Sequence, residues 1–376
     1  MLETLVCHPS ELSDRDTEAW SGFQAASPFF ESPLLGPAFA KAVGDVRADA
    51  AVAIYRRDGR PVAFLPHHRR PWGFARPIGA PFSDYHAVIG APDDPISAVE
   101  ALRGARLAAF RFGGLIDPAL RFAGAVASTD VGYRVVAHGE AEAARVLAGL
   151  GRNGIRNQRR YRRKLERLGP LRIVANPDRS AFEALLEWKR DQIRRTGMQD
   201  FLAADWVRTL LGRLFDAREG SFQGLALGLY AGERLVCGHF GVRQGGVYHP
   251  WIGANDPAFR GYSAGFIHQW MAIEAMPSLG LRVYDLGPGA GHWKARFAND
   301  LTTIAAGLAI AGGWRAPPVL AAFPVIGRVR RRLDQISATQ LTFSGRLKGV
   351  AEALGGYGRR LQSHNGATGA SPGRPA

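Results

Sequence analysis

The sequence predicts an α/β (α+β) fold made of two related lobes, each a mixed sheet flanked by helices. At 376 residues the chain is long enough for two domains, and its 46% of hydrophobic residues suffice for globular cores. Segments 51–68 and 225–242 share a pattern of strand, turn and strand with matching apolar alternation, and a helix-rich segment precedes each. We interpret this repeat as an internal duplication. The alternative is that two unrelated β-hairpins share a simple pattern.

The N-terminal half alternates between helix-type and strand-type segments. Asp58-Gly59 is a strong turn signal between two β-like runs and predicts a hairpin. We expect helices at 14–26, 38–43 and 94–103, and strands at 50–56, 60–67, 86–89 and 107–112.

The C-terminal half is predicted to begin with two helices and to continue as strand, helix and strand after its own hairpin. The expected segments are a connecting helix or linker at 140–150, helices at 151–168 and 266–276, and strands at 247–252 and 281–286. Gly312-Gly313 ends this lobe. We therefore divide the chain into an N-terminal lobe (1–140), a C-terminal lobe (141–313) and a basic, Pro/Gly-rich, partly disordered tail (314–376).

The formal net charge of +15 is concentrated in two segments. Residues 151–172 carry nine Lys/Arg and one acid, and residues 314–376 carry ten and two. The basic helix is either a solvated helix or a contact for a polyanion such as donor phosphates, a nucleotide-linked substrate or RNA. Tyr161 is its only aromatic residue, so nucleic acid is the least expected of these partners. The tail is either a solvated segment or a peripheral contact with an acidic membrane surface.

Two cysteines, Cys7 and Cys237, provide neither a disulfide framework nor a zinc site, so we expect a reducing compartment and no metal. The N-terminal residues lack the basic and apolar regions of a secretory signal. The most apolar long stretch, 302–327, is interrupted by Arg315 and three prolines, which argues against a spanning helix. We expect a cytoplasmic protein, with peripheral attachment at the inner membrane as the alternative.

One loop in the C-terminal half is suited to phosphate. Arg260, Gly261, Ser263, Ala264 and Gly265 place an arginine and small residues just before a predicted helix. Free backbone N–H groups and the positive end of the helix dipole bind anions at such a position, and small side chains allow close approach. The loop therefore predicts a phosphorylated donor at the helix start.

This loop resembles the Arg/Gln-x-x-Gly-x-Gly/Ala loop with which GNAT-superfamily acyltransferases bind the pyrophosphate of acyl-CoA, with Ser263 where the middle glycine is usual. The order of motifs from about residue 150 to 300 resembles the CelD-like, polysaccharide-biosynthesis branch of that superfamily, and the N-terminal half resembles it more faintly. These motifs are Arg156, Trp188-Lys189, Gln192, CGHFG, SAG, YDLGPG and Trp293-Lys294. The resemblance implies acetyl-CoA or another acyl-CoA as donor, and tandem GNAT-like lobes as in Fem-type relatives. At the equivalent place the first lobe has residues 90–95, whose acids repel phosphate and whose prolines lack N–H donors, so we expect it to be a scaffold or acceptor wall.

Direct acyl transfer needs a held donor, a base for the acceptor's proton and a group that stabilises the oxyanion. The sequence has no recognisable Ser/His/Asp or Cys/His set, so we expect the acceptor to attack the thioester directly. Asp285, at a strand end, is either a base or the partner of a basic neighbour. His239 is either a base or a packed polar residue. Lys294 matches a family lysine and either contacts the acceptor or oxyanion, or forms a surface salt bridge.

The acceptor side is assigned from the resemblance. Trp188, Lys189 and Gln192 match the family's helix pattern and are expected to line the acceptor site, with a core position as the alternative for Trp188. Asp84-Tyr85 matches a feature of the first lobe and implies acceptor contact. Trp293 stands where the family often has tyrosine, so it cannot supply a phenolic proton.

The leading hypothesis is an acetyl-CoA-dependent N- or O-acetyltransferase that acts on a sugar precursor or polysaccharide. The alternative is a Fem-type transferase that takes its donor from aminoacyl-tRNA. A third is a non-catalytic protein whose basic segments bind anionic membranes or polyanions.

Overall fold

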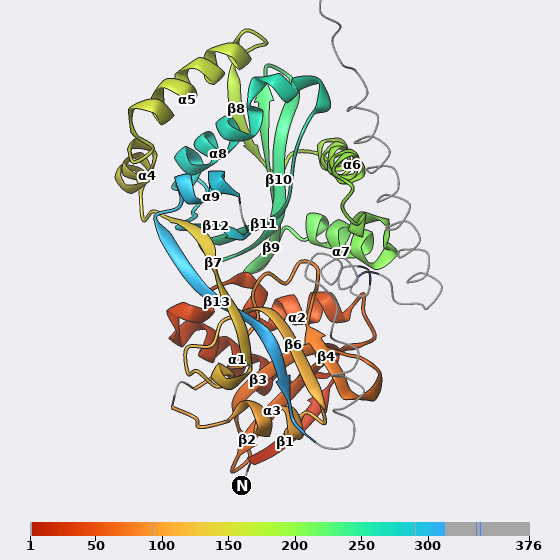
Figure 1. The fold of residues 1–376 in the computed structure, drawn as a ribbon. Coiled ribbons are helices and arrows are strands. Elements are labelled where there is room, and N and C mark those ends of the chain that lie inside the picture. The colour runs from red at the N-terminus through yellow and green to blue at the C-terminus, as the bar shows by residue number, and fades with distance from the viewer. Residues whose placement is uncertain (1, 92, 290, 313–335, 337–338, 340–376) are drawn as a thin grey trace, which may run out of the picture.

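The computed structural model describes residues 2–91, 93–289, 291–312, 336 and 339. The predicted tail, 314–376, lies outside the described residues apart from Ile336 and Thr339. Figure 1 shows an N-terminal half and a C-terminal half joined by long strands that run between them. All the named strands belong to one mixed sheet. Among the described residues, no helix is long and apolar enough to cross a bilayer.

The strands of the N-terminal half are β1 (Leu2–Cys7), β2 (Ala50–Arg57), β3 (Arg60–Arg69), β4 (Phe74–Pro77), β5 (Ile89–Gly90), β6 (Ala109–Leu115) and β7 (Val126–Val136). Those of the C-terminal half are β8 (Leu171–Ala175), β9 (Phe222–Ala231), β10 (Arg234–Gln244), β11 (Val247–Asn255), β12 (Val283–Pro288) and β13 (Asp300–Ile310). The helices are α1 (Asp14–Ala26), α2 (Pro37–Gly44), α3 (Ala98–Gly104), α4 (Glu140–Ala148), α5 (Gly151–Glu166), α6 (Arg179–Thr196), α7 (Asp205–Asp216), α8 (Ala264–Ala275) and α9 (His292–Phe297).

The two halves repeat one strand order. In the N-terminal half the order is β1-β2-β3-β4-β6, and in the C-terminal half it is β8-β9-β10-β11-β12. Each half is antiparallel except for one parallel pair, β4 with β6 and β11 with β12. Two helices follow the first strand in both halves, α1 and α2 in one and α6 and α7 in the other. This correspondence supports the internal duplication predicted from the two hairpins.

Each half of the sheet is completed by a strand from the other half of the sequence. Strand β7 pairs with β12 of the C-terminal half, and β13 pairs with β6 of the N-terminal half. The two exchanged strands also pair with each other, from Asp300↔Arg134 to Gly307↔Val126. The lobe boundary near residue 140 stays a prediction, but the sheet itself continues across it.

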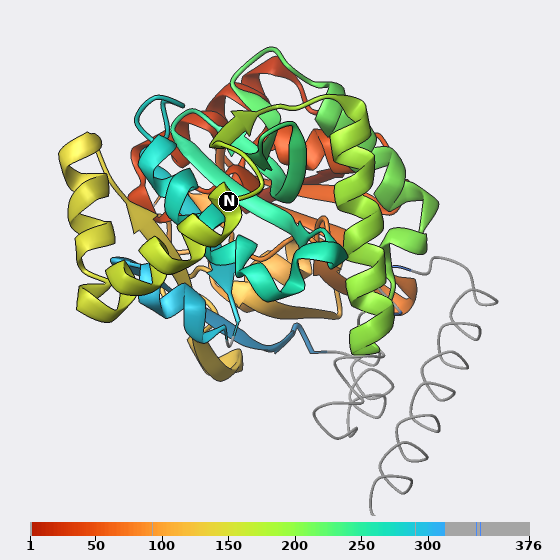
Figure 2. The same ribbon diagram turned by 90° about the horizontal axis from the view of Figure 1, so that it is seen from above.

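Helices cover both faces of the sheet. In the C-terminal half, α6 and α7 lie on one face, while α4, α5, α8 and α9 lie on the other (Figures 1 and 2). A buried apolar cluster joins the first face of both halves, because it includes Phe39 of α2, Leu211 of α7 and Phe240 of β10. This shared core covers the first face of the sheet and holds the two halves together there.

Two predicted elements of the N-terminal half are shorter than expected. The strand expected at 86–89 is reduced to Ile89–Gly90 and an isolated bridge at His86. The helix expected from residue 94 begins at Ala98, because Pro95 disfavours helical geometry before it and Ser97 caps the helix.

Candidate active site

A cavity of about 620 Å³ opens where two parallel strands separate. Strands β11 and β12 pair only at Val247↔Val283 and Tyr248↔Tyr284, although β11 continues to Asn255 and β12 to Pro288. Beyond the paired residues the strands diverge, and residues 250–255 and Leu286 line the space between them. A β-bulge in this part of β11 adds Trp251 opposite the Phe240/Gly241 step of β10. The two strands thus form a wedge, along which they do not pair with each other.

The first turn of α8 closes one end of this wedge. Ser263 and Gly265 line the cavity, and Ser263 occupies the left-handed region, with φ 53° and ψ 38°. Its side chain does not cap the helix. Among the described residues, no backbone acceptor takes the amide hydrogens of Ser263, Ala264 or Gly265. These donors are therefore available to an anion, as the sequence predicted.

The corresponding helix of the N-terminal half has the opposite arrangement. Ser97 accepts a hydrogen bond from the amide of Glu100, and the Glu100 carboxylate accepts one from the amide of Ser97 at 2.9 Å. This capping box uses the donors and places a negative charge at the start of α3. Two amides at the start of α3 are therefore taken, unlike the three available amides at the start of α8.

Helix α5 packs against residues 260–265, the loop before α8, which we call the donor loop. Lys164 donates from Nζ to the carbonyl of Gly261 at 2.8 Å and lies over the ring of Tyr262. Tyr161 contacts the ring of Phe266, and hydrogen bonds with the side chains of Ser263 and then Arg160 lower the pKa of Tyr161. The side chain of Arg260 itself lines the cavity. Gly261 does not, and its carbonyl instead joins the loop to α5.

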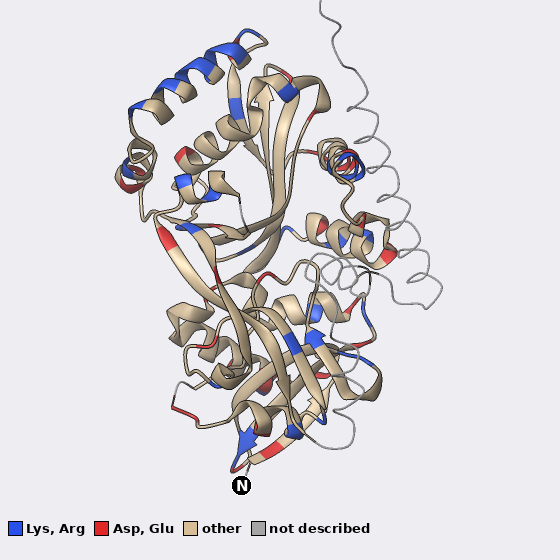
Figure 3. Cartoon of the chain, viewed as in Figure 1, with Lys and Arg blue, Asp and Glu red and all other residues tan. Residues whose placement is uncertain are grey.

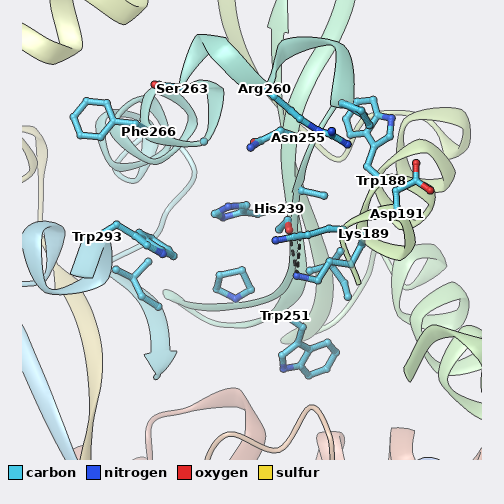
Figure 4. Close-up of a pocket in the computed structure, with 18 of the residues that line it drawn as sticks. Trp188, Lys189, Asp191, His239, Trp251, Asn255, Arg260, Ser263, Phe266 and Trp293 are labelled. Atoms are coloured by element: carbon cyan, nitrogen blue, oxygen red, sulfur yellow. Dashed lines mark hydrogen bonds between the residues drawn. The ribbon is translucent and has the colours of Figure 1, made fainter. Parts of the chain in front are cut away.

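His239 lies in the middle of the cavity (Figure 4). Its Nδ1 atom is 2.7 Å from the hydroxyl of Tyr284, and its ring packs on His268 with centroids 4.1 Å apart. Gly253 allows this placement, because a Cβ atom there would lie 3.0 Å from Nε2 of His239. Burial, reinforced by His268 and two nearby lysines, holds the pKa of His239 well below 6.5. The imidazole is therefore neutral near pH 7.

Two lysines flank this histidine. Lys189 of α6 places Nζ 3.4 Å from both Gln192 Oε1 and the carbonyl of Gly253. Lys294 of α9 donates to the carbonyl of Pro288 at 2.6 Å. Burial lowers the pKa of both lysines, and Lys294 further lowers that of Lys189.

Most predicted site residues meet in this cavity. Those that line it are Arg260, Ser263, Gly265, His239, Lys294, Trp188, Lys189, Gln192 and Trp293. Figure 4 shows Trp293 and Phe266 on one side of His239, and Trp188, Lys189 and Asp191 on the other. The sequence analysis missed Trp251, Asn255 and Arg195, which also line the cavity. Arg195 lies one helical turn from Asp191, a spacing that signals a shared face but no specific chemistry.

Asp285, Asp84 and Tyr85 do not line this cavity and instead form a polar cluster between the halves. Asp285 is 3% exposed and accepts hydrogen bonds from the Tyr85 hydroxyl at 2.9 Å and from the amide of Gly287 at 2.8 Å. His249 of β11, also missed, places Nε2 3.0 Å from Asp84 Oδ2 and Nδ1 3.6 Å from Asp285 Oδ1. Burial disfavours its charge, but the carboxylates of Asp285 and Asp84 outweigh burial and raise the pKa of His249 to about 9. Of the two roles considered for Asp285, the geometry favours pairing with a basic neighbour.

The comparisons with known proteins agree with this geometry. Residues 152–295, less than half of the chain, match the family described as acetyltransferase (GNAT) domain. The matched segment contains the donor loop, His239 and both cavity lysines. A comparison with curated protein sequences found no match.

Several solved structures are similar over most of this chain. The crystal structure of FemX has a TM-score of 0.54 at 11% identity, covering 85% of this chain and 99% of that one. A tandem GNAT protein from the clavulanic acid biosynthesis pathway has a TM-score of 0.47 at 12% identity, covering 83% and 99%. L-PGS from Bacillus licheniformis has a TM-score of 0.45 at 12% identity, covering 82% and 95%. The similarity to FemX shows a shared fold.

The match over residues 152–295 supports an acyltransferase with a GNAT-type domain in its C-terminal half. Its transferase half contains the wedge between β11 and β12 and the start of α8. The N-terminal half has the same strand order without an available helix start.

Proposed function

We propose that this protein transfers an acyl group, in the first instance acetyl, from acyl-CoA to an amine or hydroxyl of a sugar precursor or polysaccharide. The single observation that supports the donor is the start of α8, where three backbone amides are available beside Arg260. The cavity extends from these amides along the wedge to His239, so a donor bound by its diphosphate would direct its thioester towards the histidine. The sugar acceptor is supported by the resemblance of the cavity motifs to CelD-like proteins.

His239 is the proposed base. The acceptor nitrogen or oxygen attacks the thioester carbonyl carbon, the C–S bond breaks, and the CoA sulfur leaves as a thiolate that is then protonated. The acceptor's proton passes to His239, which is neutral and therefore able to accept it. The hydrogen bond between Nδ1 and Tyr284 orients the ring.

Arg260→Ala tests the donor site. We expect its affinity for acetyl-CoA to fall about 10- to 100-fold, since a charge-assisted hydrogen bond contributes about 1.5–3 kcal/mol. Isothermal titration calorimetry measures this directly. Arg208→Ala, in an exposed arginine of α7 outside the cavity, is the matched control and should bind normally. Absence of acetyl-CoA and CoA binding to the wild type, or unchanged binding by Arg260→Ala, contradicts the proposal.

Turnover tests the base. A panel of amino sugars and polysaccharide fragments, assayed with acetyl-CoA, identifies the acceptor. His239→Gln is then expected to lose about 10²- to 10⁴-fold in kcat, the usual contribution of a positioned base, while binding acetyl-CoA with wild-type affinity. The exposed His138→Gln serves as control. Wild-type turnover by His239→Gln would assign the base elsewhere.

A second candidate, transfer from aminoacyl-tRNA, is favoured by one surface of α5. Arg152, Arg156, Arg159 and Arg163 are exposed and recur at spacings of four, three and four residues, so they lie in one row about 16 Å long. Figure 3 shows this concentration of basic residues along the helix. Within the part of the chain that the structure describes, no carboxylate pairs with these four arginines. Binding that requires tRNA and weakens steeply with salt, while CoA is ignored, would favour this candidate over acetyl-CoA.

A further inference from the structure

The cavity holds more positive charge than the donor loop requires. Four cationic side chains line it, Lys189, Arg195, Arg260 and Lys294, against one carboxylate, Asp191. That carboxylate is already paired with Arg194 of the same helix. With Arg260 assigned to the donor diphosphate, the two lysines beside His239 face no counter-charge within the cavity.

Among the described residues neither lysine forms an ion pair with a carboxylate, although Asp84, Asp285 and Asp130 are near enough to favour the charged form of Lys294. Lys189 makes only two long contacts, both of 3.4 Å, to an amide oxygen and a backbone carbonyl. The Nζ atom of Lys294 donates hydrogen bonds to the backbone carbonyls of Gly287 and Pro288. Both side chains are partly buried, and after burial the nearby Lys294 further lowers the pKa of Lys189. A like-charged pair in a partly desolvated space is costly unless an anion joins it.

We propose that Lys189 and Lys294 form a subsite for an anionic group, a phosphate or carboxylate, carried by the acceptor. The inference rests on the proposed function and narrows it, because it makes the acceptor an acidic molecule. Both lysines lie near enough to His239 to lower its pKa, and Figure 4 shows Lys189 apart from Arg260 and Ser263 of the donor side.

The aromatic lining suggests the shape of the same acceptor. Trp188 and Trp293 border the cavity on opposite sides of His239, whereas the indole of Trp251 packs against Phe82 and Phe39 of the N-terminal half. The faces of two indoles at a cavity wall bury the apolar faces of a ring. The subsite therefore fits a sugar that bears an anionic group.

Titration calorimetry with a matched pair of probes tests the inference. Glucosamine 6-phosphate and glucosamine are titrated into the CoA-loaded protein and, separately, into the free protein. We expect the phosphorylated sugar to bind at least about 10-fold more tightly, the effect of one charge-assisted contact. Lys189→Met should remove this preference, and Lys189→Arg should keep most of it, since arginine also binds phosphate. Lys41→Met, in a lysine of α2 outside the cavity, should leave it unchanged.

The outcomes separate this inference from the proposed function. If glucosamine 6-phosphate, glucuronate and inorganic phosphate all bind no better than glucosamine, the subsite is overturned, while CoA binding still supports the transferase. A preference that survives in Lys189→Met also overturns it. If succinyl-CoA instead binds more tightly than acetyl-CoA and only this preference depends on Lys189, the anion belongs to the acyl group and the acceptor assignment fails.

Discussion

Ser263→Asp is expected to reduce the affinity for acetyl-CoA by at least about 100-fold while the chain remains folded. The new carboxylate would lie at the start of α8, beside the amides of Ala264 and Gly265. A negative charge about 4 Å from a phosphate costs about 4 kcal/mol at the effective dielectric constant near a protein surface. It also favours the helix itself, because acids stabilise a helix N-terminus. The variant therefore separates donor binding from stability.

Ser263→Asn is the matched control for this experiment. Asparagine has nearly the size of aspartate and, like it, tolerates the left-handed conformation that Ser263 adopts, but it carries no charge. We expect it to bind acetyl-CoA within a few-fold of the wild type. Calorimetry gives the affinities, and thermal unfolding shows that both variants are folded. Equal binding by the two variants would show that the donor phosphates lie elsewhere.

The aspartate variant would copy into the second half what the first half already has. Glu100 caps the start of α3, and this carboxylate makes the equivalent position unsuitable for phosphate. A loss of acetyl-CoA binding in Ser263→Asp would therefore indicate that a carboxylate at such a helix start is sufficient to exclude the proposed donor.

The second large effect is a loss of stability at alkaline pH that depends on His249. The folded protein holds its pKa at about 9, above the ordinary value of 6.5, because the Asp285 and Asp84 carboxylates outweigh the effect of burial. The folded state thus binds a proton that the unfolded chain releases above pH 6.5. The stabilisation is fully present below about pH 6.5 and is lost as pH rises towards 9, by about 3 kcal/mol in all.

Urea unfolding between pH 6 and 9.5 measures this effect. His249→Gln should remove the slope in this range and should cost about 3 kcal/mol at pH 6.5, since two carboxylates then lose their shared partner. The exposed His138→Gln should retain the wild-type slope. Tyr85 and Lys294 also border the cluster. Burial and the carboxylates of Asp285 and Asp84 raise the pKa of Tyr85, so Tyr85 stays protonated in this range. A wild-type slope in His249→Gln would exclude the cluster as its origin.

This cluster links the two halves close to the site. Asp84 and Tyr85 come from the N-terminal half, and His249 and Asp285 come from strands β11 and β12, which form the wedge. Gly287, with φ 68°, lets the Asp84 carboxylate approach, because a Cβ atom there would lie 2.8 Å from its oxygen. Lys294 binds the carbonyls of the same turn. The N-terminal half thus supports the position of a cavity lysine, which gives it a structural role in the transferase site.

Local signals in the sequence determined several features that the structure shows. The turn at Asp58-Gly59, the helices at 14–26 and 266–276 and the donor loop all depend on residues near one another in the chain. The availability of amides at Ser263–Gly265 follows from the same short segment, because a helix start lacks partners for its first N–H groups. The resemblance to a family helix pattern predicts Trp188, Lys189 and Gln192 at one site, and all three line the cavity.

Only the tertiary structure decided how the two halves are joined and which acids face the site. The exchange of β7 and β13 depends on pairing between strands more than 150 residues apart, for which periodicity gives no signal. Its place at a strand end allows Asp285 to be either a catalytic base or the partner of a basic neighbour. In the structure its carboxylate contacts Tyr85 and His249, which lie 200 and 36 residues away in the chain. Side-chain chemistry near a helix start is local and can be derived from sequence, whereas the protonation and partners of a buried carboxylate depend on whichever distant segments pack against it.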